Sequence, residues 1–418
     1  MKEGFCMSND VFAPLTLHCG AVLRNRIAKA AMEESMADPG QVPGERLIAL
    51  YERWGAGGAG LLITGNVMVH AQALTGPGCV ALDAHAPLEP FVRWARAGRA
   101  GGAAMWMQIS HPGRQVLADM PGVAWAPSAV AVDLGRLSGR FARPVEMTPA
   151  QIEETAARFV TTARVAEQAG FDGVEIHAAH GYLLSQFLSP LVNRRTDRWG
   201  GSLENRARLL LQVVRGIRAA VAPTFAVAVK LNSADFQRGG FDEGDCANVI
   251  AMLAPLGVDL VELSGGSYES PAMMGRPTDG RTSAREAYFL ELASQLAATS
   301  PIPLMLTGGI TRRETAERVL SGGVAVVGMG TAIALTPDLP NRWRAGGEAA
   351  EAPRAVTWGN KALASAASMA VVRHHMRRLT RGKTPRAGTH PAHALVCEQL
   401  TDRRSLRSYR SWLAQRAD

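Results

Sequence analysis

The stretch FDGVEIHAAH, residues 171–180, shows the pattern on which the fold prediction rests. A short apolar run ends in a polar cluster, and it follows the segment 149–170, whose apolar residues recur at helical spacing up to Gly170. A helical segment followed by a short apolar run is typical of parallel βαβ units, in which helices cover the strands. Because the same pattern recurs along the chain, we expect one repeated architecture.

Eight such apolar runs occur, each short and rich in Val, Ile and Leu. They lie at 26–32, 59–66, 103–110, 171–180, 225–232, 258–266, 302–309 and 324–330. Helical patterns separate several of them, as at 311–323 and at 202–221, where Ser202 is a suitable N-cap. Eight strand–helix units in succession predict an α/β fold, a (β/α)8 TIM barrel, with an open doubly wound sheet as the alternative.

Polar side chains end several of the predicted strands. In a (β/α)8 barrel, the carboxyl ends of all the strands meet at one rim, and active sites lie there. We therefore expect polar residues from five separate strands to converge on one site. These residues are Gln108, His177, Lys230, Ser264 and Thr307.

Two glycine-rich segments, TGGIT (307–311) and GMGT (328–331), follow the seventh and eighth predicted strands. The loops at these places are the habitual phosphate site of barrel enzymes, and glycine lets backbone N–H groups approach phosphate oxygens. Ordinary turn chemistry is the alternative. We favour phosphate binding, which implies a cofactor or substrate that carries a phosphate group.

His177 and His180 lie three residues apart, and Tyr182 follows them. The pair lacks the spacing and the glutamate of an HExxH zinc motif, so we predict no metal. Two imidazoles can instead donate hydrogen bonds to one oxygen, and a tyrosine hydroxyl can deliver a proton to carbon. The remaining alternative is a histidine pair that only satisfies local backbone groups.

The composition argues against several classes of protein. Apolar residues make up 47% and charged residues 20% of the 418 residues, as in ordinary globular proteins. The five cysteines are scattered, and we find no apolar span or signal-peptide core, so we expect a cytoplasmic protein. The net charge of +8 divides into +10 from residue 352 onward and −2 before it, which gives no hint of nucleic-acid binding by the main body.

The basic segment 346–418 follows the predicted barrel and is expected to form a helical extension packed on it. Within it, residues 359–383 have the pattern of a basic amphipathic helix, which could lie on a membrane or bind an acidic partner. We favour packing on the barrel through the Ala, Met and Val face, with the arginines in water, because the helix lacks an aromatic anchor.

The segment 175–214, EIHAAHGYLLSQFLSPLVNRRTDRWGGSLENRARLLLQVV, resembles the old yellow enzyme family of FMN-dependent oxidoreductases. Its H-x-x-H-G-Y-L, FLSP…NRRTD and GGS-x-E-N-R motifs are highly specific in combination. The resemblance extends over roughly residues 10–345, in family order, and the C-terminal segment resembles that of the NADH:flavin oxidoreductase branch. It implies that residues 8–345 form an FMN-binding TIM barrel. Further similar segments lie at 23–38, 61–69, 107–115, 126–130, 229–241 and 262–273.

The resemblance also implies a set of cofactor contacts. Gln108 would hydrogen-bond the pyrimidine edge of the flavin, and the positive charge of Lys230 near flavin N1 and O2 would stabilise the reduced anion. Met32 and Gly65 would line the ring. The phosphate would receive backbone N–H groups from Gly308, Gly309 and Gly330.

Three positions in the implied FMN site depart from the family pattern. Glu33 stands near flavin N5 and O4 where relatives carry Thr or Cys, and a carboxylate there opposes flavin reduction unless it is protonated or paired. We hypothesise that Glu33 tunes the flavin or contacts an unusual substrate. Thr331 replaces an arginine that binds the FMN phosphate, and Ala31 replaces a common proline.

The implied activity is the reduction of α,β-unsaturated carbonyl compounds with NADH or NADPH as reductant. Hydride would pass from the nicotinamide to FMN N5 and then to the β-carbon of the alkene. His177 and His180 would hold the carbonyl oxygen while Tyr182 protonates the α-carbon. We expect a small enone-type substrate, no nucleic-acid or membrane partner, and allow for a homo-oligomer.

Other activities stay open at this point. A flavin-dependent desaturase or a non-redox double-bond isomerase could use the same scaffold. The family branch that acts on dienoyl-CoA thioesters carries an iron–sulfur cysteine cluster and a second nucleotide-binding domain, which we do not find here. A flavin-free binding protein is suggested only by Glu33 and Thr331.

Overall fold

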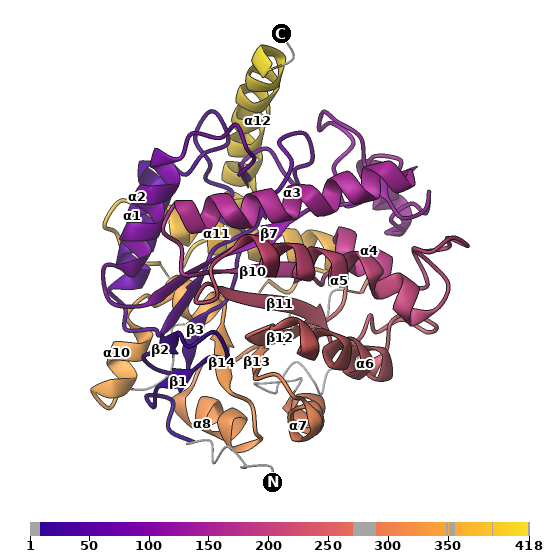
Figure 1. Cartoon of the computed structure of the whole chain (residues 1–418). Coiled ribbons are helices and arrows are strands. Elements are labelled where there is room, and N and C mark those ends of the chain that lie inside the picture. Colours follow the sequence, from indigo (N-terminus) through magenta and orange to yellow (C-terminus); the bar gives the residue numbers. More distant parts are fainter. Residues whose placement is uncertain (1–8, 271–289, 348–349, 351–355, 387, 417–418) are drawn as a thin grey trace.

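The strands of the computed structural model form a closed parallel barrel (Figure 1). The structure describes residues 9–270, 290–347, 350, 356–386 and 388–416. Strand β14 pairs with β3 and β7 pairs with β10, so the barrel has no open edge. The predicted TIM barrel is therefore confirmed, and the open-sheet alternative is wrong. In barrel order the strands are β3 (Ile27–Lys29), β4 (Leu61–Ile63), β7 (Ala104–Ser110), β10 (Gly173–Ala178), β11 (Ala226–Asn232), β12 (Leu260–Ser264), β13 (Leu304–Thr307) and β14 (Val326–Met329).

Helices surround the barrel, and their starts follow from local sequence. Helix α3 begins after Thr148, whose side chain accepts from the backbone N–H of Gln151 while the Gln151 side chain accepts in return, a capping box. Ser202 caps α5 through the N–H of Asn205, as predicted. The outer helices are α1 (Glu45–Gly55), α2 (Glu89–Arg99), α3 (Pro149–Gln168), α5 (Leu203–Ala220), α6 (Glu243–Leu253), α7 (Leu290–Thr299) and α8 (Arg313–Ser321).

Shorter elements lie in the connections between these strands and helices. The helical ones are α4 (Leu183–Leu188), α9 (Thr331–Leu335), α10 (Leu339–Arg344) and two 3-10 turns, Gly135–Arg140 and Ala254–Leu256. The strands β1 (Leu15–Thr16) and β2 (Val22–Leu23) form a small antiparallel pair. Two further parallel pairs are β5 (Val67–Met68) with β6 (Val80–Ala81), and β8 (Trp125–Ala126) with β9 (Val145–Glu146).

The barrel interior changes from apolar to polar along the strands. Side chains two residues apart on a strand point to the same side, so Trp106 and Gln108 face one way, as do Leu260 and Glu262. The first member of each pair is fully buried in the inner apolar cluster, which also contains Ala228. Apolar side chains therefore fill the barrel interior beneath a layer of polar side chains at the carboxyl ends of the strands.

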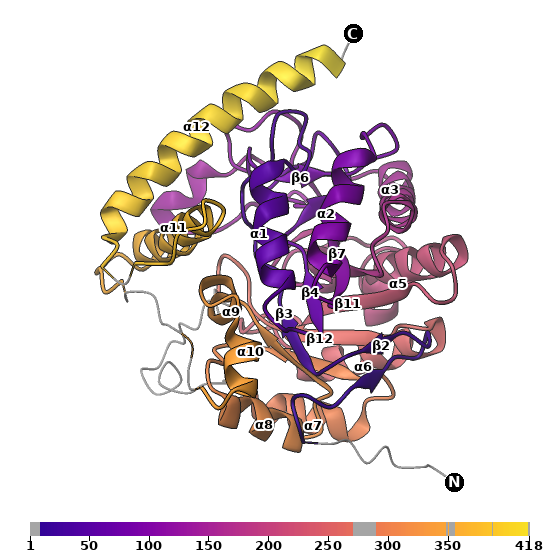
Figure 2. The ribbon, with the colours of Figure 1, turned by 90° about the vertical axis from the view of Figure 1, so that its left-hand side faces the viewer.

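The C-terminal segment forms two helices, α11 (Lys361–Leu379) and α12 (Pro391–Arg416), which lie beside the barrel (Figure 2). Helix α11 packs against α1, α9 and α12, and Val372 and Met376 join the main core. The expectation that its arginines lie in water is wrong for Arg373 and Arg377, because both form ion pairs with Glu398 of α12. The division of the chain near residue 345 stays a prediction.

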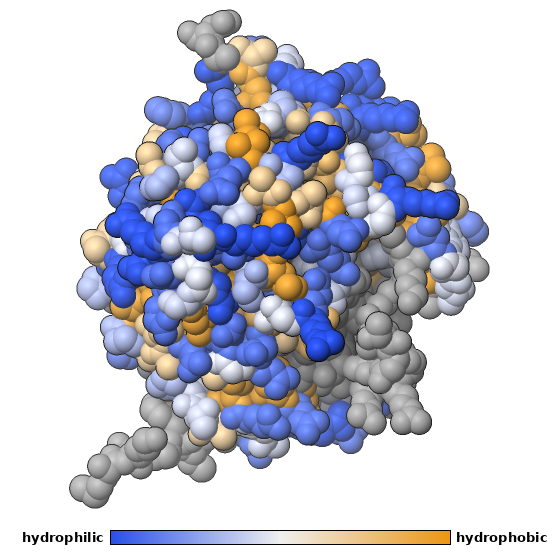
Figure 3. All heavy atoms as spheres, turned by 90° about the vertical axis from the view of Figure 1, so that its right-hand side faces the viewer, coloured by the Kyte–Doolittle hydropathy of each residue, from blue (hydrophilic) through white to orange (hydrophobic). Residues whose placement is uncertain are grey.

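The surface is mostly polar, as Figure 3 shows for one face, where hydrophilic side chains surround several separate apolar patches. Large exposed apolar side chains come from scattered elements, for example Val22 of β2 and Val145 of β9. Within the described ranges, no helix is both long and apolar enough to cross a membrane. Most of the large apolar side chains are instead buried in the core.

Tyr409 provides a test of how α12 is attached. It is fully buried, and its hydroxyl donates to the carbonyl oxygen of Ala71 at 2.8 Å. We expect Tyr409→Phe to lower the free energy of unfolding by about 1 kcal/mol, the net value of one hydrogen bond. Tyr409→Ala should cost about 3–5 kcal/mol, because it also leaves a cavity. Urea denaturation checks both values, and two variants as stable as the wild type would show that α12 is not anchored here.

Candidate active site

The structure brings His177, His180 and Tyr182 together at the carboxyl end of β10. The ring of His177 lies edge-on to the ring of His180, with centroids 5.0 Å apart, and edge-on to the ring of Tyr182 at 4.8 Å. His177 and Tyr182 are buried, and His180 is partly buried. The three side chains that the sequence singled out therefore form one compact group.

An unusual backbone conformation shapes this group. His180 has φ 60°, in the left-handed region that only a few non-glycine residues adopt, and Gly181 follows with φ 74°. The backbone N–H of His180 donates to Asn232 Oδ1 at 3.0 Å, and its carbonyl accepts from Gln115 Nε2 at 3.0 Å. Contacts from two other strand ends thus hold a conformation that costs energy, as is common at functional sites.

The two histidines are electrically neutral. The backbone N–H of Ala179 donates to His177 Nδ1 at 3.2 Å, so the proton of His177 lies on Nε2. His180 Nε2 lies 2.7 Å from the hydroxyl oxygen of Ser264. Burial, followed by the positive charge of Lys230, lowers the pKa of His180 well below its ordinary value, and burial lowers that of His177 in the same way. Each ring therefore offers one N–H without carrying a charge.

Tyr182 has a partner that the sequence did not reveal. Its hydroxyl lies 3.1 Å from the hydroxyl of Tyr268, which follows β12. Burial, Tyr268 and the charge of Glu33 raise the pKa of Tyr182 well above its ordinary value. Burial and Glu33 raise the pKa of Tyr268 to about 12. Both phenols therefore keep their protons at neutral pH.

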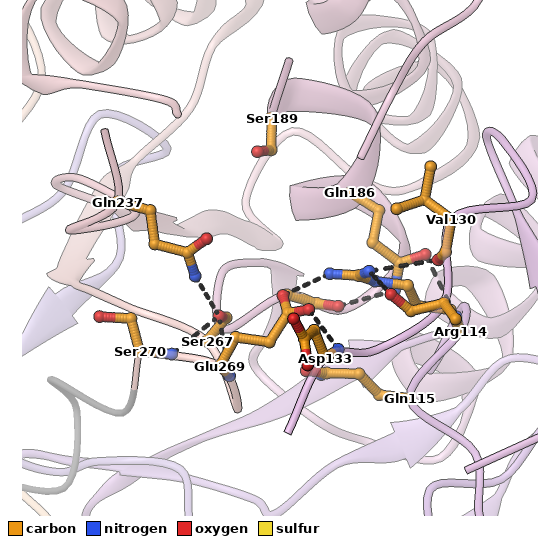
Figure 4. Close-up of polar contacts among 12 residues, drawn as sticks. Arg114, Gln115, Val130, Asp133, Gln186, Ser189, Gln237, Ser267, Glu269 and Ser270 are labelled. Atoms are coloured by element: carbon orange, nitrogen blue, oxygen red, sulfur yellow. Dashed lines mark hydrogen bonds and ion pairs between the residues drawn. The ribbon is translucent and has the colours of Figure 1, made fainter. Parts of the chain in front are cut away.

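An ion pair beside Tyr268 ties together the loops above the barrel (Figure 4). The guanidinium of Arg114 contacts Glu269 at 2.5 Å and donates to the carbonyl oxygens of Val130 and Ala131. The other carboxylate oxygen of Glu269 accepts from the backbone N–H of Asp133 at 2.7 Å. These contacts fix the position of Glu269, which is adjacent to Tyr268 in the chain.

Gln108 and Lys230 lie in the polar layer of the barrel. Gln108 Nε2 donates to Glu175 at 2.5 Å, and the Lys230 amine contacts Glu262 at 2.7 Å. Burial opposes the charge of Lys230, but Glu262 and Glu175 outweigh it and raise the pKa of the amine. Burial and Glu262 raise the pKa of Glu175 well above its ordinary value. Burial also opposes the charge of Glu262, but Lys230 together with hydrogen bonds from Glu175 and Thr307 outweighs it and lowers the pKa of Glu262. The layer therefore holds one protonated carboxyl, one carboxylate and one cation.

Gly65 and Gly330 both lie close to Met32. A side chain at Gly65 would overlap the carbonyl oxygen of Met32, and one at Gly330 would lie 3.3 Å from the Met32 sulfur. Gly308 and Gly309 follow β13 with φ 158° and 66°, both in the positive range that glycine adopts readily. Three further residues were predicted to contact the cofactor. Ala31 packs against the inner apolar cluster, Glu33 lies in the loop after β3, and Thr331 is the first residue of α9.

The Glu33 carboxylate is paired at both of its oxygens. Its Oε1 accepts from the Thr75 hydroxyl and, at 2.8 Å, from the Cys79 thiol. Its Oε2 lies 3.3 Å from the guanidinium of Arg373 on α11. The arginine comes from the C-terminal helices, so local sequence around Glu33 could not have identified it.

The next residue, Glu34, was not singled out from the sequence. Its carboxylate accepts from the Tyr51 hydroxyl at 2.5 Å and from the backbone N–H of Gly65 at 3.2 Å. The fully buried Lys29 amine lies 4.0 Å away and 4.3 Å from the centre of the Trp54 ring. Glu34 thus anchors the loop after β3 to α1, whereas Glu33 faces the opposite way.

Comparisons with known proteins agree with this site. The model of the NADH:flavin oxidoreductase / NADH oxidase family matches residues 10–349. The chain belongs to this family. The NADH-dependent flavin oxidoreductase iliE of Hypocrea jecorina is 37% identical over 351 residues, which cover 78% of this chain and 87% of that protein.

Solved structures of this flavin oxidoreductase family have the same fold. The old yellow enzyme homologue of Zymomonas mobilis superposes with a TM-score of 0.69 at 26% identity, over 84% of this chain and 98% of that one. Morphinone reductase gives the same TM-score and identity over 83% and 92%. This chain is an oxidoreductase that uses FMN and a nicotinamide reductant.

The residues present fit FMN. A flavin that gains negative charge on reduction suits a permanently charged Lys230 amine, which burial would otherwise discharge. Glycine at positions 65 and 330 lets the chain pass close to Met32, at its carbonyl oxygen and at its sulfur respectively. The positive φ angles of Gly308 and Gly309 allow backbone N–H groups to approach a phosphate.

Lys230→Met tests the polar layer without the cofactor. Removing the cation leaves the buried Glu262 carboxylate without its ion-pair partner, so we expect the apoprotein to lose about 3–5 kcal/mol of unfolding free energy in urea denaturation. The matched control, Lys383→Met, changes an exposed lysine and should cost at most about 0.5 kcal/mol. The double variant Lys230→Met/Glu262→Gln should recover part of the loss. Equal stability of Lys230→Met and the control would contradict the assigned charges.

Proposed function

We propose that this flavin oxidoreductase reduces the C=C bond of small α,β-unsaturated carbonyl compounds. The observation that carries the proposal is the grouping of two neutral histidines with a protonated Tyr182 at one strand end. The arrangement matches an alkene conjugated to a carbonyl, because one part of the substrate gains negative charge on oxygen while another takes up a proton on carbon.

His177 and His180 bind the carbonyl oxygen of the substrate. His177 is buried and His180 is partly buried, and donors in a site that excludes water stabilise a developing oxyanion more strongly than donors in water do. His177 uses its Nε2–H, because its Nδ1 already accepts a backbone N–H. Because both histidines are neutral, they stabilise the negatively charged, enolate-like oxygen by donating hydrogen bonds to it.

Tyr182 delivers a proton to the α-carbon. Its raised pKa keeps the phenol protonated until a carbon base forms next to it. Tyr268 accepts from or donates to the Tyr182 hydroxyl, so it orients that hydroxyl and can return a proton to it. Bound FMN, once reduced by NADH or NADPH, supplies the hydride to the β-carbon.

The FMN site of this proposal uses both charged side chains and backbone groups. Gln108 and Lys230 would hold the pyrimidine edge of the flavin, and Met32 and Gly65 would line the ring. Ala31 and Glu33, on the same loop as Met32, would adjoin it. The N–H groups of Gly308, Gly309 and Gly330 and the hydroxyl of Thr331 would hold the phosphate.

Tyr182→Phe tests the proton donor. Under anaerobic stopped-flow conditions with cyclohexenone, we expect the oxidative half-reaction to slow by about 100-fold or more. The reductive half-reaction with NADH or NADPH should keep its wild-type rate, since no proton reaches carbon in it. Tyr268→Phe, the matched control, should slow the oxidative step less. Wild-type oxidation of the flavin by cyclohexenone in Tyr182→Phe would rule out this role, and failure of NADH and NADPH to bleach the flavin would favour an isomerase.

The pH dependence of the same step tests the charge states. The donor is the protonated phenol, so rising pH removes activity, and a raised pKa moves that loss above the ordinary tyrosine value of about 10. The lowered histidine pKa values leave both rings neutral through neutral pH. We expect a flat oxidative rate from about pH 6 to about pH 9. An inflection at about pH 6.5 would show that His177 or His180 titrates with an ordinary histidine pKa, contrary to this prediction.

A further inference from the structure

Arg373 is a charged residue of the C-terminal helices that reaches the loop after β3. Its Nε donates to the backbone carbonyl of Glu33 at 3.1 Å, and its guanidinium also contacts the Glu33 carboxylate at 3.3 Å. On its other side it pairs with Glu398 of α12 at 2.9 Å. Only 18% of the Arg373 side chain is exposed. The guanidinium is therefore locked between a carboxylate of α12 and a carboxylate at the candidate site.

Glu33 is held from the opposite side as well. Thr75 and Cys79 donate to its Oε1, while Arg373 occupies its Oε2 and its backbone carbonyl. A carboxylate with only 17% of its side chain exposed is costly unless it is paired and hydrogen-bonded. Of its described partners, Arg373 alone carries a positive charge, so the charge balance at Glu33 depends on α11.

The charge of this pair extends to the tyrosines. After burial, the negative charge of Glu33 is the next cause that raises the pKa of Tyr268, and it also acts on Tyr182. Arg373 acts on Tyr268 in the opposite direction. Glu33 and Arg373 thus have opposing effects at the place where the proposed chemistry occurs.

We propose that Arg373 is a positioning residue of the active site, which fixes the Glu33 carboxylate and offsets its charge beside the flavin. The pair of helices α11 and α12 is then a functional part of the site and not only a structural support. The assignment rests on the proposed cofactor site, in which Glu33 adjoins the flavin ring. Because reduction adds negative charge to a flavin, an uncompensated carboxylate there makes reduction less favourable.

The test is the midpoint potential of FMN bound to the full-length holoenzyme, measured by spectroelectrochemical titration. We expect Arg373→Gln to make the reduction equilibrium of FMN at least tenfold less favourable. That change lowers the midpoint potential by about 30 mV for a two-electron couple. Glu33→Gln should raise it, and the double variant should return close to the wild type. Arg373→Lys, which keeps the charge, should restore most of the loss. The matched control is Arg407→Gln, on the exposed side of α12, and should change nothing.

Two outcomes would overturn the proposal. One is a potential of Arg373→Gln equal to that of the control, and the other is a shift of both single variants in the same direction, as a general disturbance of the site would cause. If Arg373→Gln does not fold, an unchanged potential in Glu33→Gln overturns the proposal by itself. The titration needs bound flavin but no alkene, so loss of enone reduction with these shifts intact contradicts only the proposed function.

Discussion

The ion pair between Lys230 and Glu262 is the constraint on which the site depends. The two residues are direct partners on the neighbouring strands β11 and β12, so the register of the barrel fixes their contact. A buried pair of this kind survives only while both partners are present, because either charge alone would be strongly destabilised. Glu175 adds a second carboxyl group, whose pKa is raised by burial and then by the charge of Glu262, so it stays neutral.

The same cation determines the character of the histidines. Lys230 pairs in register with His177 of β10, and its positive charge, after burial, helps to keep His177 and His180 uncharged. In the proposed reaction, neutral histidines would donate hydrogen bonds to the substrate oxygen without carrying a charge. The positive charge of Lys230, which suits a reduced flavin, therefore also favours the neutral state of the two histidines.

Sequence patterns predicted the barrel because each of its strands lies in a short, largely apolar run, and they predicted Gln108, His177 and Lys230 because polar residues at strand ends converge on one rim. They did not predict Tyr268 or Arg373. Tyr268 becomes important only through the loop that places its hydroxyl against Tyr182, and Arg373 lies 340 residues from the glutamate that it binds. Amphipathic spacing assigned the arginines of α11 to water because it cannot reveal a buried partner on another helix.

The neighbouring glutamates Glu33 and Glu34 show why sequence alone could not complete the site. Both follow Met32 in one extended loop, and neither the composition nor the spacing distinguishes them. Their side chains diverge, so Glu34 binds Tyr51 and the backbone beneath the loop while Glu33 meets the helix α11. The Glu34 carboxylate fixes the position of the loop. Glu33 is thereby held at a fixed position, where Arg373 balances its charge. A departure from the family pattern at position 33 is therefore accommodated by a C-terminal helix, and the two features have to be understood together.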